Sequence, residues 1–266
     1  MIKLIASDMD GTLLNDKKEL PGDFFEVLGK LEQHGIRFTV ASGRSYDAVA
    51  HLFPEEYRGK LDFICDNGAN IYHDGKQADF TPLERSTFEQ LIKACDQIGE
   101  LRVLVCAGRG TYHLKADPTF TAEIAKYYKN HIPCDDLLAV DDIIYKVAVC
   151  DMQGTEKRAK PALDAIMGDK LNVQVSGPIW MDVMSAGVNK GSALERLAAL
   201  LGLDREEVMA FGDYYNDAEM LHFAGWSFAM ENGHPDVKRM ARYLARSNNE
   251  NGVLRAVRKY ALGEDA

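Results

Sequence analysis

Acidic side chains follow two short apolar runs that lie far apart in the chain. Asp8 and Asp10 come directly after the first run, and Asp213 and Asp217 come directly after the second. Both runs are typical of strands that are buried on both faces. Carboxylates that gather in one place repel each other unless a cation lies among them, and an all-oxygen set with room for water suits Mg²⁺. The residues therefore favour magnesium-dependent chemistry on an anionic substrate.

Three further polar segments could hold the anion. Ser42 and Gly43 end another predicted strand, Asn67 lies in the turn after a third, and Lys190 opens a predicted helix. Backbone N–H groups and an ammonium are groups that bind phosphate. The carboxyl ends of parallel strands meet at one edge of a sheet, so we expect these groups in one cleft. The nucleotide-binding patterns GxxxxGK[ST] and GxGxxG are absent, so we predict phosphoryl transfer without a P-loop.

Four motifs, in chain order, resemble those of the haloacid dehalogenase (HAD) superfamily. They are Asp8-Met9-Asp10-Gly11-Thr12-Leu13, Ser42-Gly43-Arg44, Lys190-Gly191 and Gly212-Asp213-Tyr214-Tyr215-Asn216-Asp217. The segment between the second and third motifs is similar to the C2 cap of the Cof-type, subfamily IIB, phosphatases. The resemblance extends over essentially the whole chain, including the tail segments 229–232 and 247–252. It implies a Mg²⁺-dependent phosphoric monoester hydrolase that acts on a small phosphorylated metabolite, such as a sugar phosphate or a phosphorylated cofactor.

The resemblance assigns catalytic roles to three residues. Asp8 would be the nucleophile and would form an aspartyl-phosphate. Asp10 would protonate the leaving oxygen and then activate water. Two residues at i and i+2 that leave a strand can point the same way, which suits this pair. Lys190 would bridge Asp8 and the phosphate.

The resemblance also implies a metal site and a phosphate site. Mg²⁺ would bind the carboxylates of Asp8 and Asp213 and the backbone carbonyl of Asp10. The phosphate oxygens would be held by Met9, Ser42, Gly43 and Asn216. Asp217 would orient Lys190 or the metal shell. Asn67 either forms an Asn-Gly turn or borders the leaving group, and both interpretations stay open.

The elements that must position these residues alternate between strands and helices at both ends of the chain. Strand, helix, strand, helix, strand is the pattern of a parallel sheet with right-handed crossovers. We therefore predict an α/β, Rossmann-like HAD core from residues 1–81 and 185–266. Its closing helices are expected at 235–244 and 253–262.

The middle of the chain has a different rhythm. A hairpin around residues 107–110 and further strands and helices, including one at 119–130, indicate an α+β pattern. We predict that residues 82–184 form an inserted C2B-type cap. Because a cap closes over the leaving group, substrate choice should lie there. The candidate residues are Arg109, Tyr112, His113, Lys146, Trp180 and Asp182, and only one of Tyr112 and His113 can face the cleft, since they alternate on a strand.

Composition excludes several other classes of protein. The 266 residues carry 31 basic and 41 acidic side chains, a net charge of −10, which disfavours nucleic-acid binding. No segment reaches the ~18 apolar residues that a membrane span needs. Five scattered cysteines without metal-ligand spacing are typical of buried residues in a reducing compartment, so we expect a cytoplasmic protein. The sequence leaves the oligomeric state undetermined.

Two alternative functions remain at this point. A phosphomutase on the same scaffold would return the phosphate to its substrate instead of to water. A non-catalytic sensor of phosphorylated metabolites could keep the fold, although a binding protein needs no nucleophile.

Overall fold

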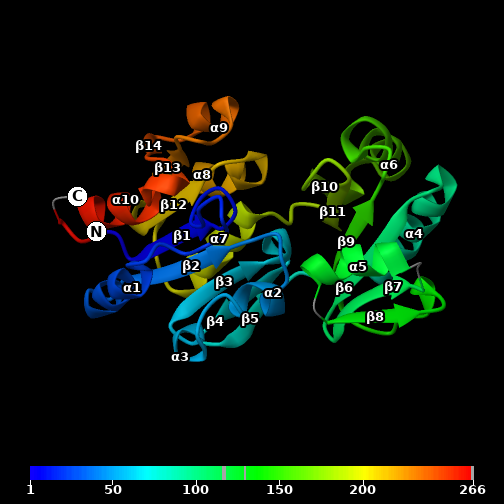
Figure 1. Cartoon of the computed structure of the whole chain (residues 1–266), viewed down its shortest axis with the longest axis horizontal. Coiled ribbons are helices and arrows are strands. Elements are labelled where there is room, and N and C mark those ends of the chain that lie inside the picture. The colour runs from blue at the N-terminus through cyan, green and yellow to red at the C-terminus, as the bar shows by residue number, and fades with distance from the viewer. Residues whose placement is uncertain (116–117, 129, 265–266) are drawn as a thin grey trace. The chain divides into compact units, whose positions relative to one another are not determined.

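A computed structural model of the chain describes residues 1–115, 118–128 and 130–264 (Figure 1). Its contacts divide the chain into two compact units. The first unit contains residues 1–42, 53–78 and 189–266, and the second contains residues 43–52 and 79–188. The long segment of the second unit begins and ends within a few residues of the predicted insert. The short segment 43–52 was expected in the core.

The first unit is built on an eight-stranded sheet. From one edge to the other its strands are β14 (Tyr243–Ala245), β13 (Trp226–Met230), β12 (Val208–Gly212), β1 (Leu4–Asp8), β2 (Arg37–Ala41), β3 (Leu61–Cys65), β4 (Asn70–His73) and β5 (Lys76–Phe80). Neighbours from β14 to β3 are parallel, and β4 is antiparallel to β3. The carboxyl ends of β1, β2, β3 and β12 therefore lie at one edge, where the sequence predicts the site.

Helices cover this sheet on both faces. They are α1 (Phe24–Gln33), α3 (Glu55–Arg58), α7 (Lys190–Leu200), α8 (Ala218–Phe223), α9 (Pro235–Met240) and α10 (Gly252–Tyr260). Side chains alternate along a strand, so Leu4 and Ala6 lie on one face, where they pack with Leu194 of α7. Phe38 lies on the other face, where its ring meets Phe24 of α1 edge-on at 5.4 Å. Asp8 continues the alternation of Leu4 and Ala6 and therefore leaves the sheet on the α7 face.

The helix predicted over residues 235–244 begins at Pro235 as predicted, but its predicted end was wrong. Helix α9 ends at Met240, and Tyr243–Ala245 forms the edge strand β14 beside β13. The Tyr243 ring stacks on Phe228 with ring centroids 4.9 Å apart. This aromatic contact and the backbone hydrogen bonds of the sheet edge override the helical pattern.

The sequence analysis also missed the hairpin of β4 and β5. Asp74 and Gly75 join the two strands with φ angles of +49° and +72°. Positive φ at both central residues is typical of a type I′ hairpin turn, for which Asp-Gly is a preferred pair. The pair was therefore a usable signal, but the flanking residues lack the apolar alternation that would have drawn attention to it.

The second unit contains a six-stranded sheet and four helices among its described residues. Its strand order is β10 (Leu171–Val175), β11 (Trp180–Ser185), β9 (Ile144–Cys150), β6 (Arg102–Ala107), β7 (Gly110–Leu114) and β8 (His131–Cys134). Neighbours are antiparallel except β7 and β8. Its helices are α2 (Tyr46–Ala50), α4 (Arg85–Ile98), α5 (Pro118–Tyr127) and α6 (Lys160–Met167). The predicted helix 119–130 includes residue 129, which lies outside the described residues.

Helices α4 and α6 cover one face of this second sheet. Phe88 and Leu163 from these helices pack against Val105, Val147 and Val183 from the central strands. The architecture is the α+β pattern predicted for the insert.

The cysteines behave as buried hydrophobes. Cys65, Cys95, Cys106 and Cys150 are buried, and Cys134 is half-buried. Burial raises the pKa of the Cys95 thiol to about 12 and that of Cys150 to about 11, so neither forms a reactive thiolate near neutral pH. Within the described residues, no helix is both long and apolar enough to cross a membrane.

A tight turn after β3 supports the first residues of α7. Gly68 closes this turn, residues 66–68, with φ +102°. A Cβ atom there would lie 2.2 Å from the carbonyl oxygen of Asn189, which directly precedes α7. Arg196 of α7 also donates a hydrogen bond to the Gly68 carbonyl at 3.1 Å. Only glycine permits this close approach.

We expect Gly68→Ala to lower the free energy of unfolding by at least about 2 kcal/mol, because the left-handed backbone and the steric overlap each have a cost. The measurement is urea unfolding followed by circular dichroism. Gly29→Ala is the matched control. Gly29 lies within α1 with nothing near the position of its Cβ, so that change should stabilise the protein by about 0.5–1 kcal/mol. Equal effects of the two changes would contradict the role assigned to Gly68.

Candidate active site

A buried lysine joins two carboxylates at the end of β1. The Nζ atom of Lys190 lies 2.5 Å from Oδ1 of Asp8 and 2.7 Å from Oδ1 of Asp217. Lys190 and Asp217 are fully buried, and Asp8 is 7% exposed. A buried ammonium without partners would be very costly, so each of these charges depends on the others.

The local sequence of α7 explains why Lys190 stands there. Asn189 caps the helix, since its side-chain oxygen accepts from the backbone N–H of Ser192 at 2.7 Å. The Ser192 hydroxyl accepts in return from the Asn189 N–H at 3.1 Å. This capping box begins the helix at Lys190. A cation at a helix N-terminus opposes the helix dipole, and the two carboxylates offset that cost.

A third carboxylate, Asp213, completes an acidic cluster. Both Asp213 and Tyr214 donate their backbone N–H to Oδ2 of Asp217, at 3.0 and 3.3 Å. The Thr12 hydroxyl donates to Oδ1 of Asp213 at 3.1 Å. One carboxylate oxygen from each of Asp8, Asp213 and Asp217 lies within 4.8 Å of the others. The cluster thus gathers oxygen ligands from β1, from the turn after β12 and from the start of α8.

The charges in this cluster do not balance. Burial, together with the neighbouring carboxylates, raises the pKa of Asp8 to about 8 and that of Asp213 to about 6. Burial alone would lower the pKa of Lys190, but Asp217 and Asp8 raise it above its usual range. The ammonium therefore stays charged and cannot compensate all three carboxylates. A divalent cation with oxygen ligands fits both the donor set and the excess negative charge.

Gly11 leaves room for the Asp213 carboxylate. Its φ of +86° is left-handed, and a Cβ atom would lie 2.5 Å from Oδ2 of Asp213. The glycine after Asp10 therefore serves both the sharp turn and the acidic cluster.

Two of the residues predicted to hold phosphate, Ser42 and Asn216, are linked through Asn67. Ser42 is buried at the end of β2, and its carbonyl accepts from the backbone N–H of Asn67 at 3.1 Å. The side chain of Asn216 contacts Oδ1 of Asn67 at 3.4 Å. Met9 is buried directly after Asp8. Gly43 is grouped with the second unit.

Asn67 forms the Asn-Gly turn that was one of the two interpretations of this residue. Its φ is +53°, a left-handed conformation that asparagine tolerates better than most residues. Its buried side chain also reaches Asn216, so the turn does not account for all that it does. Its predicted place beside the leaving group stays a prediction.

Asp10 stands apart from the buried cluster. Its side chain is 38% exposed, and its Oδ1 lies 2.8 Å from Nζ of Lys18. The contacts of Lys18 with Asp10 and of Thr12 with Asp213 were not predicted from the sequence. The position of Thr12 directly after Asp-Gly was a signal for its contact with Asp213. No spacing rule indicated the contact of Lys18 with Asp10.

A second acidic group in the first unit already has a cation of its own. Asp62, His73 and Asp74 lie close enough together to hold a metal ion. However, Nη2 of Arg37 lies 2.5 Å from Asp62 and 2.9 Å from Asp74. The guanidinium supplies the positive charge that a metal would otherwise provide, so this group is an ion-pair network.

Four of the predicted cap residues share one face of the second unit's sheet. The register places His113, Lys146, Trp180 and Asp182 on the face opposite α4 and α6. Phe120 and Ile124 of α5 pack on this face, and all four side chains except that of Trp180 are buried. Lys146 lies 3.1 Å from Asp182, and its Nζ also donates to the Gly43 carbonyl at 2.7 Å.

The other two cap candidates lie elsewhere in the second unit. Arg109 lies on the turn between β6 and β7, where it pairs with Asp142 at 3.2 Å and remains 65% exposed. Tyr112 packs on the helix-covered face and donates to Asp142 at 3.0 Å. Tyr112 and His113 therefore occupy opposite faces, as their alternation predicts.

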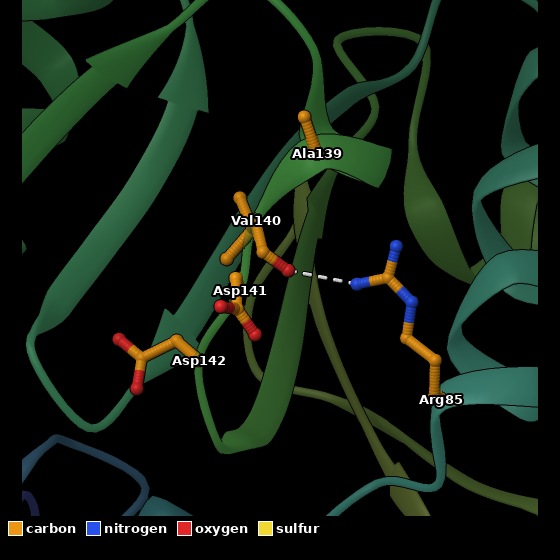
Figure 2. A pocket seen from close by; sticks show the side chains of 5 residues that line it. All are labelled: Arg85, Ala139, Val140, Asp141 and Asp142. Carbon is orange, nitrogen blue, oxygen red and sulfur yellow. Dashed lines mark hydrogen bonds between the residues drawn. The ribbon is translucent and has the colours of Figure 1, made fainter.

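The second unit also contains an open cavity of about 440 Å³ (Figure 2). Its lining residues are Arg85, Ala139, Val140, Asp141 and Asp142. The Arg85 guanidinium donates to the Val140 carbonyl at 2.7 Å. None of the clustered carboxylates lines this cavity, so we assign it no part in the chemistry of the site.

A parallel sheet with an acidic cluster and a buried lysine at its carboxyl edge defines a Rossmann-like hydrolase core. A model of the haloacid dehalogenase-like hydrolase family matches residues 5–257. A 5-amino-6-(5-phospho-D-ribitylamino)uracil phosphatase of Escherichia coli is 34% identical over 260 residues, which cover 97% of this chain and 96% of the relative. The chain therefore belongs to the haloacid dehalogenase-like hydrolases, and it is a phosphoric monoester hydrolase.

Solved structures agree with this family. A protein from Streptococcus mutans has a TM-score of 0.89 at 28% identity, with 98% of this chain and 100% of that chain covered. A subclass IIB sugar phosphatase has a TM-score of 0.83 over 98% of this chain and 99% of that chain. Its identity of 20% shows a common fold alone. The fold is thus the mixed α/β architecture that the motifs predicted.

The stability of the metal-free protein should depend on pH through Asp8 and Asp213. Their pKa values in the folded protein lie above the ordinary 3.8, so the folded state binds these protons more tightly than the unfolded state. The stability that they contribute is present below about pH 4 and is lost as the pH rises through about 6 and 8. We expect Mg²⁺ at about 100 times its dissociation constant to restore about 2.7 kcal/mol at pH 8.

The measurement is urea unfolding at pH 5 and pH 8, with EDTA or with MgCl₂, at one ionic strength set by NaCl. At pH 5 the carboxyls keep their protons and the gain from Mg²⁺ should be clearly smaller. A gain of the same size at both pH values would contradict the electrostatic description of the cluster.

Proposed function

We propose that this enzyme hydrolyses a small phosphorylated metabolite through an aspartyl-phosphate on Asp8, with Mg²⁺ as its cofactor. The observation that carries the proposal is the buried contact of 2.5 Å between Lys190 and Asp8, with Asp213 beside it. A carboxylate paired with an ammonium next to a cation site can approach an anionic phosphate, which an unpaired carboxylate would repel.

In the first step a carboxylate oxygen of Asp8 attacks the phosphorus atom. The bond between phosphorus and the leaving oxygen breaks, and Asp10 donates its proton to that oxygen, so the alcohol departs neutral. Lys190 holds Asp8 in place and faces the phosphate. Asp217 keeps the ammonium charged and oriented.

In the second step water attacks the phosphorus atom of the aspartyl-phosphate. Asp10, now a carboxylate, accepts the proton of that water, and the bond between Asp8 and phosphorus breaks. Inorganic phosphate leaves, and both aspartates return to their starting states. One residue thus serves as acid and then as base.

The other residues hold the phosphate and the cation. Ser42 and Asn216, with the N–H groups of Met9 and Gly43, would bind the phosphate oxygens. The carboxylates of Asp8 and Asp213, with the carbonyl of Asp10, would hold Mg²⁺. When bound, Mg²⁺ neutralises charge on the phosphate oxygens.

We assign substrate choice to the second unit as a cap. The sheet face opposite α4 and α6 carries His113, Lys146, Trp180 and Asp182, of which His113, Lys146 and Asp182 are buried. They provide cationic, acidic and aromatic groups for a polar leaving group. The name of the relative from Escherichia coli supports a phosphorylated ribitylaminouracil as one member of the substrate class. We keep sugar phosphates as a second proposed member. We also propose that the enzyme acts in the cytoplasm.

Asp8→Asn should lower the rate of phosphate release from p-nitrophenyl phosphate with Mg²⁺ by more than about 10⁴-fold, because an amide cannot form the covalent intermediate. The far-ultraviolet circular dichroism spectrum should stay unchanged. Asp169→Asn, at an exposed position, is the matched control and should keep full activity. Undiminished turnover by the Asp8 variant would exclude the covalent mechanism.

The substrate class can be measured with a panel of phosphorylated metabolites. The panel contains 5-amino-6-(5-phospho-D-ribitylamino)uracil and sugar phosphates, ranked by kcat/KM for release of inorganic phosphate. We expect release of one phosphate for each substrate consumed. A chromatogram that shows an isomerised sugar phosphate without free phosphate would instead identify a phosphomutase.

A further inference from the structure

The loop after Asp10 places a lysine against the predicted proton donor. Nζ of Lys18 lies 2.8 Å from Oδ1 of Asp10, and the two side chains are 60% and 38% exposed. An exposed ion pair of this kind contributes only about 0–1 kcal/mol to stability. Stability is therefore a weak reason for the fold to maintain this contact.

The backbone is strained at Lys18. Its φ is +64°, the left-handed region, which costs a residue with a side chain of this kind on the order of 1–2 kcal/mol. Asn15 supports the turn, since its side-chain oxygen accepts from the N–H groups of Lys17 and Glu19 at 2.9 and 3.0 Å. The Lys18 N–H donates to the Asn15 carbonyl at 2.9 Å. The turn from Asn15 to Glu19 is therefore closed by its own hydrogen bonds.

Asparagines from the far end of the chain anchor this turn. The side-chain amides of Asn248 and Asn249 donate to the Asp16 carboxylate at 3.1 and 2.9 Å, and the Asn248 amide also donates to the Leu14 carbonyl at 3.0 Å. Asn249 accepts in turn from the Asp16 N–H at 3.1 Å. These hydrogen bonds lower the pKa of Asp16 and keep it a carboxylate.

A third asparagine extends the anchor to the residue after Asp10. Asn232 accepts from the N–H of Asn248 at 3.0 Å and donates to the Gly11 carbonyl at 2.7 Å. The segment between Asp10 and Lys18 is thus fastened at Gly11 and at Asp16 by residues more than two hundred positions away.

We propose that Lys18 is a positioning residue that holds the carboxyl group of Asp10 in one orientation, from which Asp10 can reach the leaving oxygen. The proposal rests on the proposed function of Asp10. A half-exposed side chain has several rotamers, and the anchored ammonium favours one of them. The asparagine anchor holds Lys18 in its left-handed turn. Its effect should grow as the leaving group becomes poorer, because only a poor leaving group needs the proton.

The test compares two aryl phosphates with leaving groups of different quality. Lys18→Ala should lower kcat/KM for phenyl phosphate by about 10-fold or more and that for p-nitrophenyl phosphate by less than about 2-fold. Lys18→Arg keeps the cation and should retain most of the activity on both. Lys17→Ala, at the neighbouring exposed lysine, is the matched control and should change neither value.

Two further measurements separate positioning from a structural effect. Lys18→Ala added to Asp10→Asn should cause no additional loss on phenyl phosphate, since the residue through which it acts is gone. The midpoint of thermal unfolding should be the same for Lys18→Ala and Lys17→Ala.

Equal losses of Lys18→Ala on both substrates, or no loss on either, would overturn the proposal. Failure of the proposed function gives a different result. In that case the wild-type protein would release no phosphate from either ester, or Asp8→Asn would remain active.

Discussion

The structure of the site depends on one buried ammonium. Lys190 lies between Asp8 and Asp217 and is fully buried, so its charge depends on these two neighbours for its hydrogen bonds and compensation. The three groups come from β1, from α7 and from the turn before α8. Any shift of α7 against the sheet would leave a charge unpaired in the interior. The same ion pairs therefore constrain both the packing of α7 on the sheet and the arrangement of the site.

Several features of the fold serve this constraint. Side-chain alternation in β1 brings Asp8 out on the face that α7 covers. The Asn189 cap begins α7 at the lysine, and Gly68 lets the turn after β3 lie against that cap. The acidic cluster that results carries more negative charge than Lys190 can compensate, as the raised pKa values of Asp8 and Asp213 indicate. The repulsion among these carboxylates is unfavourable by itself, and a bound cation would relieve it.

Asp10 belongs to a different environment from Asp8, although only one residue separates them. Asp8 is buried and paired with Lys190, whereas Asp10 is half-exposed and paired with Lys18. Two carboxylates in two environments can take two roles, one as nucleophile and one as proton donor and acceptor. The division follows from the end of the strand, since Asp8 is its last residue and Asp10 already belongs to the turn.

The sequence by itself determined the alternation of strands and helices, the strand ends that carry Asp8, Ser42 and Asp213, and the family, because these depend on local patterns and short motifs. Only the tertiary structure decided the rest. The local pattern predicts a helix over residues 235–244, but pairing with β13 places Tyr243–Ala245 in strand β14. No local pattern indicated a role for Lys18, but asparagines from the far end of the chain anchor the turn that brings it to Asp10. Contacts between distant segments decide such positions, and a local pattern contains no information about them.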